Sequence, residues 1–164
     1  MKVCSAYKAN RMLRRLIYIG CLGLIVGIAG VLSLQYRIAI GPVVLALTVV
    51  PLLGMFFARR SFKGAIPDLI FGAIDTGILA VAALCGGFFY GVAGAIAGGV
   101  VGDALTDGIA GFFEGSIAKW LRGKGIEESR EPVTTSLGKM AGCLFGSGAI
   151  LSVALIFGIR PEFA

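Results

Sequence analysis

The chain has 164 residues and a formal net charge of +6, and 57% of its residues are hydrophobic against only 15% charged. This composition, with a mean hydropathy of +0.93, is too apolar for a water-soluble domain and too poor in charge for a disordered chain. Four widely spaced cysteines and no histidine argue against a disulfide scaffold and against zinc, haem or His-based catalysis. We therefore expect an all-α integral membrane protein.

Apolar runs of membrane-spanning length divide the chain. The hydrocarbon core of a bilayer is about 30 Å thick, and a helix needs about 20 apolar residues to cross it. Such runs predict a single transmembrane domain over residues 1–164, a polytopic bundle of about five helices with glycine-rich packing. In chain order, the predicted spans cover residues 16–34, 38–57, 66–84, 91–115 and 137–159.

The segments between the spans follow from their polar residues and breakers. The first span is longer than the apolar part of a signal peptide and lacks a clear cleavage site after it, so we expect a retained helix. The second span carries Pro42 and Pro51, which membrane helices tolerate. A tight turn over residues 85–90 joins the third and fourth spans. Residues 116–136 are predicted to form a cytoplasmic interfacial segment, and Lys139 can extend from the fifth span to the interface.

The basic residues predict the orientation of the chain. With five spans, thirteen of the fifteen Lys and Arg residues fall on one side of the membrane, and Arg37 and Arg160 fall on the other. The side rich in Lys and Arg is normally cytoplasmic. We therefore expect a cytoplasmic N-terminus and a C-terminus on the opposite side, in the cell (inner) membrane. Because these residues flank apolar runs, their expected partners are anionic lipids, and we expect no nucleic acid.

Small residues recur at every fourth position in three spans. Membrane helices associate through close backbone approach at such strips, because lipid removes most of the hydrophobic driving force between helices. The strips predict a compact bundle that assembles as a homo-oligomer or with a membrane partner subunit. They comprise Gly23 and Gly27 in the first span, Gly94, Gly98 and Gly102 in the fourth, and Gly138, Gly142 and Gly146 in the fifth.

Five of the nine acidic residues fall in the third and fourth spans. Asp68 and Asp75 are seven residues apart and share one helix face, as do Asp103, Asp107 and Glu114 on the next span. In antiparallel helices, Asp75 and Asp107 are expected at similar depth, with Asp103 near the midplane. An ionisable group near the bilayer centre costs about 2.5–3.5 kcal/mol, and such groups usually mark ion, proton or substrate paths.

If the two acidic stripes face each other, they form a site of oxygen ligands only. Thr76 and Thr106 would add hydroxyl oxygens to the carboxylates of Asp75, Asp103 and Asp107. Such a site suits hard cations: Mg²⁺, Ca²⁺ or Mn²⁺ with two or more ionised carboxylates, and Na⁺ or H⁺ with fewer. The structural alternative is that the three aspartates form a hydrogen-bonded clamp between helices.

Asp68 and Glu114 are expected nearer the cytoplasmic end, as the entrance to this site. Asp68 follows Pro67, where a carboxylate complements the dipole of a helix start, and Glu114 lies beside basic residues. Both residues therefore have an equally good explanation as ordinary decoration of helix ends.

Three functions fit these residues. The first is a small transporter or channel for a cation that passes through the carboxylate site. The second is a non-catalytic membrane subunit or scaffold whose acids pair with basic residues of a partner. The third is an interfacial metal-dependent enzyme acting on a lipid or phosphate. Residues 103–110 resemble the acidic signature of the CDP-alcohol phosphotransferases, but three residues separate Asp103 from Asp107 and no Arg follows Ala110, so we do not expect membership of that family.

Overall fold

The computed structural model describes residues 2–123 and 131–159, and within them the side chains of residues 10–109, 112 and 131–159. This part of the chain is all-helical, as predicted. Its helices are α1 (Lys2–Gln35), α2 (Ile40–Leu47), α3 (Val49–Phe57), α4 (Phe62–Gly123) and α5 (Pro132–Ile156). Four of its segments are long and apolar enough to cross a membrane, so the count of about five is not confirmed. They are Asn10–Gln35, Ile40–Phe57, Phe62–Ile109 and Pro132–Ile156.

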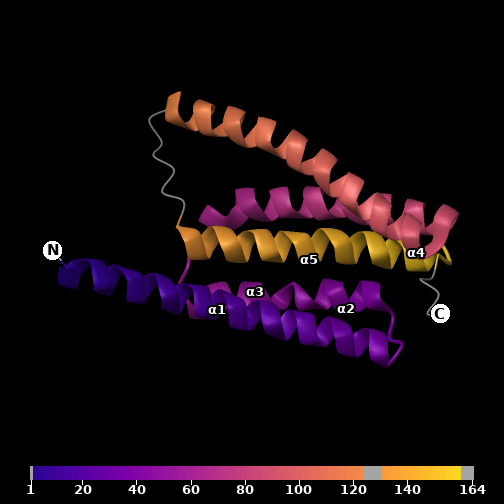
Figure 1. The fold of residues 1–164 in the computed structure, drawn as a ribbon, viewed down its shortest axis with the longest axis horizontal. Helices are drawn as coiled ribbons and strands as arrows, with labels where there is room; N and C mark the ends of the chain where they lie inside the picture. The colour runs from indigo at the N-terminus through magenta and orange to yellow at the C-terminus, as the bar shows by residue number, and fades with distance from the viewer. Residues whose placement is uncertain (1, 124–130, 160–164) are drawn as a thin grey trace.

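Helix α5 lies at the centre of the bundle. It contacts α4 on one side and α2 and α3 on the other, and α1 packs on the outer side of α2 and α3 (Figure 1). Helix α1 begins at one end of the bundle and α5 ends at the other (Figure 1). The buried residues Met55, Ala65, Val133 and Leu137 form a small core where α3, α4 and α5 meet.

The predicted span over residues 38–57 is divided into α2 and α3. Pro51 has no backbone N–H, so the carbonyl of Leu47 loses its usual helical donor. Close to this position, the N–H of Thr48 bonds the carbonyl of Leu45, three residues earlier, at 3.2 Å, so the chain forms a turn tighter than an α-helix. Pro51 itself is fully buried. The proline therefore breaks the helix where other helices pack against it.

Helix α4 reverses direction at Gly91, which has φ 62° and ψ −148°, a conformation open essentially to glycine alone. We call residues 62–90 the first limb and residues 92–123 the second limb. The limbs run antiparallel, and a Cβ added at Gly94 or Gly98 would collide with the backbone of Gly86 or Ala82. Figure 1 shows the second limb turning back along the first and then diverging from it.

The reversal explains why four segments of membrane-spanning length are found in the described chain where about five spans were predicted, because one of the four contains both limbs. The predicted turn over residues 85–90 is helical, because the chain reverses only where a glycine takes the positive φ angle. The residues of the predicted spans over 66–84 and 91–115 thus lie in two antiparallel helical limbs joined at one non-helical residue, Gly91.

Several boundaries differ from the prediction. Helix α5 begins at Pro132, five residues before the predicted span, because proline is well suited to the first helical position. The last residues of the predicted interfacial segment over residues 116–136 therefore belong to α5. The first part of this segment continues α4 as far as Gly123, its side chains before residue 131 are not described, and residues 124–130 lie outside the described chain. Helix α4 begins at Phe62, so Pro67 lies inside the helix and does not start it.

The glycine strips of α4 and α5 lie at helix contacts. A Cβ at Gly142 would collide with the backbone of Leu69 and Ala73, and one at Gly146 would collide with Ala73. The strip of α1 differs, because a Cβ at Gly27 would have no neighbour within 4 Å. The predicted glycine-rich packing is thus found between α4 and α5 and between the limbs of α4.

Candidate functional site

The close approach of the two limbs of α4 determines which acidic residues meet. A Cβ added at Gly102 would lie 3.2 Å from the Cα of Leu79 and 2.9 Å from the Cβ of Ala82. One helical turn further from the reversal, the same antiparallel register places Asp75 opposite Thr106. Asp103 and Asp107 flank Thr106 on the second limb, so three carboxylates converge there.

Asp75, Asp103 and Asp107 form the cluster that we call the carboxylate site. Each contributes a carboxylate oxygen, and these three oxygens lie within 4.8 Å of one another. Asp75 is only 9% exposed, and its Oδ1 is buried without a hydrogen-bond partner. Asp103 and Asp107 are exposed. The site therefore has one shielded ligand and two accessible ones.

The spacing of the oxygens fits one hard cation. Ca²⁺ binds oxygens at 2.3–2.6 Å, so two ligands on opposite sides of the ion are about 4.8 Å apart. Mg²⁺ requires ligands at 2.0–2.1 Å and a shorter separation, which small rotations of the aspartate side chains would give. All three side chains can therefore contact a single divalent ion.

The carboxylates have no cationic partner among the described residues. None of the three aspartates forms an ion pair with a described Lys or Arg. Lys139 of α5 places its ammonium nitrogen 5.3 Å from the centre of the Phe71 ring. Burying an uncompensated carboxylate is costly, so a positive charge from outside these residues is needed to stabilise the ionised site.

The two predicted threonine ligands differ in position. Thr106 is 4% exposed, and its hydroxyl lies 3.0 Å from the carbonyl oxygens of both Gly102 and Asp103, to which it donates. The hydroxyl proton of Thr106 therefore points to the backbone of its own helix and not to a carboxylate. Thr76 follows Asp75 by one residue, so its side chain projects about 100° away around the helix. The structure thus brings Thr106, but not Thr76, beside the carboxylates.

Asp68 does not join the carboxylate site. It is half-buried against α5, where a Cβ added at Gly138 would lie 3.2 Å from the Cβ of Asp68. The limbs diverge toward this end of α4 (Figure 1), so a residue seven positions from Asp75 faces a different neighbour. The side chain of Glu114 lies outside the described residues, and its predicted pairing in depth with Asp68 stays a prediction.

Of two residues that shape the site, Leu79 was not singled out from the sequence, and Gly102 was named there only as part of a packing strip. Leu79 and Gly102 contact each other across the limbs and thereby determine the separation of the aspartates. Pairing small residues outward from Gly91 gives this register, because Gly86 meets Gly94 and Ala82 meets Gly98. The signal was present in the sequence, but using it required knowing the residue at which the chain reverses.

Comparison with known proteins adds no functional information. The chain matches no family model, and neither a curated protein nor a solved structure is similar to it.

Proposed function

We propose that this protein is a small membrane transporter or channel for a cation, with the carboxylate site as its intramembrane binding site. One observation supports this above all: three carboxylate oxygens lie within 4.8 Å of one another, and Asp75 Oδ1 is buried without a partner. Three ionised carboxylates favour a divalent cation, Mg²⁺, Ca²⁺ or Mn²⁺, over Na⁺ or H⁺. Buried acids in a membrane protein usually serve such a path.

We propose five crossings, with the two limbs of α4 counted separately. Arg60 and Glu131 form an ion pair, and Arg15 lies 3.3 Å from the same carboxylate. The chain between residues 60 and 131 therefore leaves one end of the bundle and returns to it. Each limb exceeds the length of about 20 residues that a crossing needs. The arginines at this end make it the cytoplasmic one, with the C-terminus opposite.

The two kinds of ligand suggest how a cation would pass. Asp103 and Asp107 are accessible and can exchange water for carboxylate oxygen around an incoming ion. Asp75 completes the coordination from the shielded side. Asp68 lies two helical turns, about 10 Å, nearer the cytoplasmic end of the first limb, and in this proposal its charge attracts cations toward the site.

The test is cation flux in liposomes that contain the purified full-length protein. Wild-type protein should carry Mg²⁺, Ca²⁺ or Mn²⁺ to an entrapped indicator, with each ion assayed separately. Asp75→Asn and Asp107→Asn should abolish this flux while expression and helical content persist, because each removes one of three charged ligands. Flux retained in both variants would reject the carboxylate site.

Asp68→Asn provides the matched control. It makes the same change of charge on the same limb, outside the carboxylate site. If Asp68 serves only the entrance, this variant keeps the ion preference of the wild type and loses at most about two- to five-fold in rate, the effect of about 0.5–1 kcal/mol. Equal loss in Asp68→Asn and Asp75→Asn would mean that the assay responds to general charge and not to the site.

A second function is favoured by the exposure of Asp103 and Asp107. Two exposed carboxylates within a membrane helix would be stabilised by basic residues of a partner helix, from a second copy or another subunit. In that case, the purified protein alone would move no cation. The substitutions Asp103→Asn and Asp107→Asn would then release the partner from the complex, which co-purification measures directly.

A further inference from the structure

A second feature of the molecule is a groove where α1, the α3–α4 connection and α5 meet. The groove has a volume of about 370 Å³, within the range of 300–1,000 Å³ typical of small-molecule sites. Its walls come from three separate parts of the chain, so it exists only in the folded bundle. The residues that line it and carry the argument are Arg11, Arg14, Arg15, Arg60, Tyr18 and Phe57.

Among the described residues, the groove has more positive than negative charge. Four guanidinium groups line it, and Glu131, the acid that pairs with Arg15 and Arg60, is a single carboxylate. Arg60 uses one nitrogen for Glu131, while its Nε is buried without a hydrogen-bond partner. Guanidinium groups gathered in one groove are suited to phosphate oxygens, which they often bind in bidentate fashion.

The start of α5 adds to this positive potential. Helix α5 begins at Pro132, and Val133 in its first turn lines the groove. The first N–H groups of a helix have no partner within it, and the helix dipole makes this end positive. An anion in the groove would therefore meet both the arginines and the positive end of a helix.

The remaining wall of the groove is formed by two aromatic residues, Tyr18 and Phe57, and a hydrogen bond holds Tyr18 in place. The hydroxyl of Tyr18 donates to the carbonyl of Gly54 at 2.8 Å, which holds this ring against α3. Phe57 lies at the end of α3 and is 74% exposed. Aromatic rings are common at the level of lipid headgroups, where one side is apolar and the other wet. The groove thus offers cations above an apolar surface.

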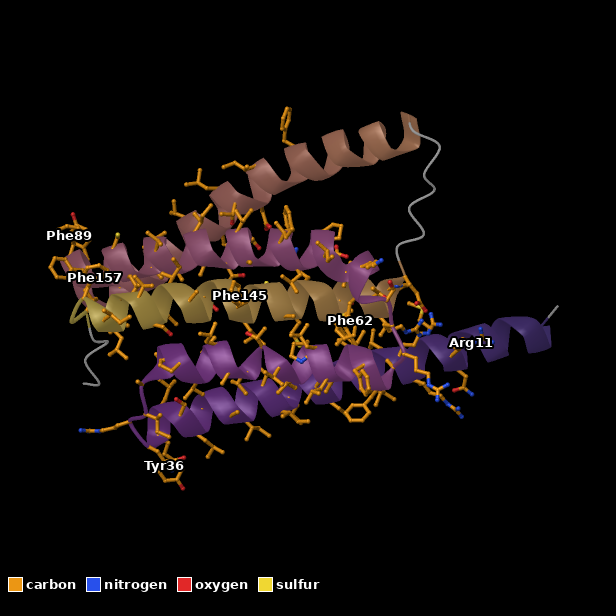
Figure 2. The ribbon with its side chains drawn as sticks, turned by 180° about the vertical axis from the view of Figure 1, so that it is seen from behind. Arg11, Tyr36, Phe62, Phe89, Phe145 and Phe157 are labelled. Carbon is orange, nitrogen blue, oxygen red and sulfur yellow. The ribbon has the colours of Figure 1, made fainter. Side chains whose placement is uncertain are left out.

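Figure 2 shows the position along the bundle of Arg11, one of the residues that line the groove. Arg11 is at one end, beside other nitrogen-bearing side chains, and Tyr36, Phe89 and Phe157 are at the opposite end. The apolar part of α1 begins directly after Arg15, so the groove lies at the boundary between charged and apolar sequence. This is the depth of phospholipid headgroups.

We propose that this arginine groove binds the phosphate of an anionic phospholipid headgroup from the cytoplasmic leaflet. The arginines would hold the phosphate oxygens, and Tyr18 and Phe57 would contact the first carbons of the lipid. The same phosphate chemistry could be supplied by a free phosphate ion, which the experiment below distinguishes. This inference does not depend on cation transport at the carboxylate site.

The experiment is native mass spectrometry of the full-length protein in detergent, titrated with phosphatidylglycerol, phosphatidylcholine or inorganic phosphate. Wild-type protein should bind one phosphatidylglycerol more tightly than phosphatidylcholine. The double variant Arg11→Gln/Arg14→Gln leaves both ion pairs of Glu131 in place. It should weaken phosphatidylglycerol binding about 25-fold, because each basic residue near the surface contributes a factor of about five.

Arg59→Gln is the matched control, since Arg59 is at the same end of the molecule but does not line the groove. Its binding of phosphatidylglycerol should stay within about two-fold of the wild type. If inorganic phosphate competes with the lipid at micromolar concentration, the groove binds phosphate and its ligand is free phosphate. Equal binding of the two lipids by wild type, or equal loss in Arg59→Gln, would overturn the proposal.

Discussion

At the scale of single residues, Asp75 is the position where stability and proposed function oppose each other. Its side chain is 9% exposed, and its Oδ1 is buried without a hydrogen-bond partner, which costs stability unless another group supplies one. A residue that served only packing would be better replaced by an apolar one. In the proposed function, a bound cation supplies the missing partner and offsets this loss of stability.

This opposition gives a prediction for Asp75→Asn. Without divalent cations, the variant should unfold at the same temperature as the wild type or higher, because a buried negative charge is removed. With a cation at about one hundred times its dissociation constant, the wild type should gain about 2.7 kcal/mol and Asp75→Asn less than about 1 kcal/mol. Thermal unfolding followed by circular dichroism, with Mg²⁺, Ca²⁺ and Mn²⁺ each added alone, measures both effects.

Asp68→Asn serves as the control for that experiment, because Asp68 lies against Gly138 of α5 and is not one of the three residues of the carboxylate site. It should keep the full cation-dependent gain of the wild type. An equal gain in Asp75→Asn and wild type would place the bound cation elsewhere on the protein.

At the scale of helices, close packing depends on glycines whose position in the bundle the sequence does not reveal. Gly142 of α5 and Gly27 of α1 both belong to predicted packing strips. A Cβ would meet backbone at Gly142 and nothing within 4 Å at Gly27. The sequence shows the spacing of small residues, but which strip has a partner within the chain is decided by the arrangement of the helices.

The pair of substitutions Gly142→Ala and Gly27→Ala tests this difference. Gly142→Ala should destabilise the protein by about 1–3 kcal/mol, because the helices must separate to accommodate the methyl group. Gly27→Ala should stay within about 1 kcal/mol of the wild type, since alanine favours helix and has space there. Thermal unfolding in one detergent compares the two. Similar losses for both would contradict the packing between α4 and α5.

The sequence predicted the helical class and the meeting of three aspartates better than it predicted boundaries. The heptad and four-residue spacings placed Asp75 and Asp107 at one depth, because helical periodicity is local. The reversal was placed too early, since residues 85–90 contain two glycines of their own and only the tertiary fold assigns the positive φ angle to Gly91. The place of Asp68 as the entrance to the site stays a prediction, because the divergence of the two limbs (Figure 1) is not encoded in the spacing along either one.

At the scale of the whole molecule, the ion pairs of Glu131 bring together α1, the α3–α4 connection and the start of α5. These three points lie at one end of the bundle (Figure 1). The α1–α2 connection and the reversal at Gly91 lie at the opposite end (Figure 1). In the proposed topology, the end with Arg15, Arg60 and Glu131 is cytoplasmic, because Lys and Arg are normally enriched on that side.

Cysteine labelling in intact cells tests this arrangement. In a background with the four native cysteines replaced by serine, Ser61→Cys should react with a membrane-impermeant maleimide only after lysis, because it lies in the α3–α4 connection. Tyr90→Cys, beside the reversal, should react before lysis, and Glu131→Cys should behave as Ser61→Cys does. This alternation requires that each limb of α4 crosses the membrane once. If Tyr90→Cys and Ser61→Cys label under the same condition, the first limb does not cross and the proposed five-span topology is wrong.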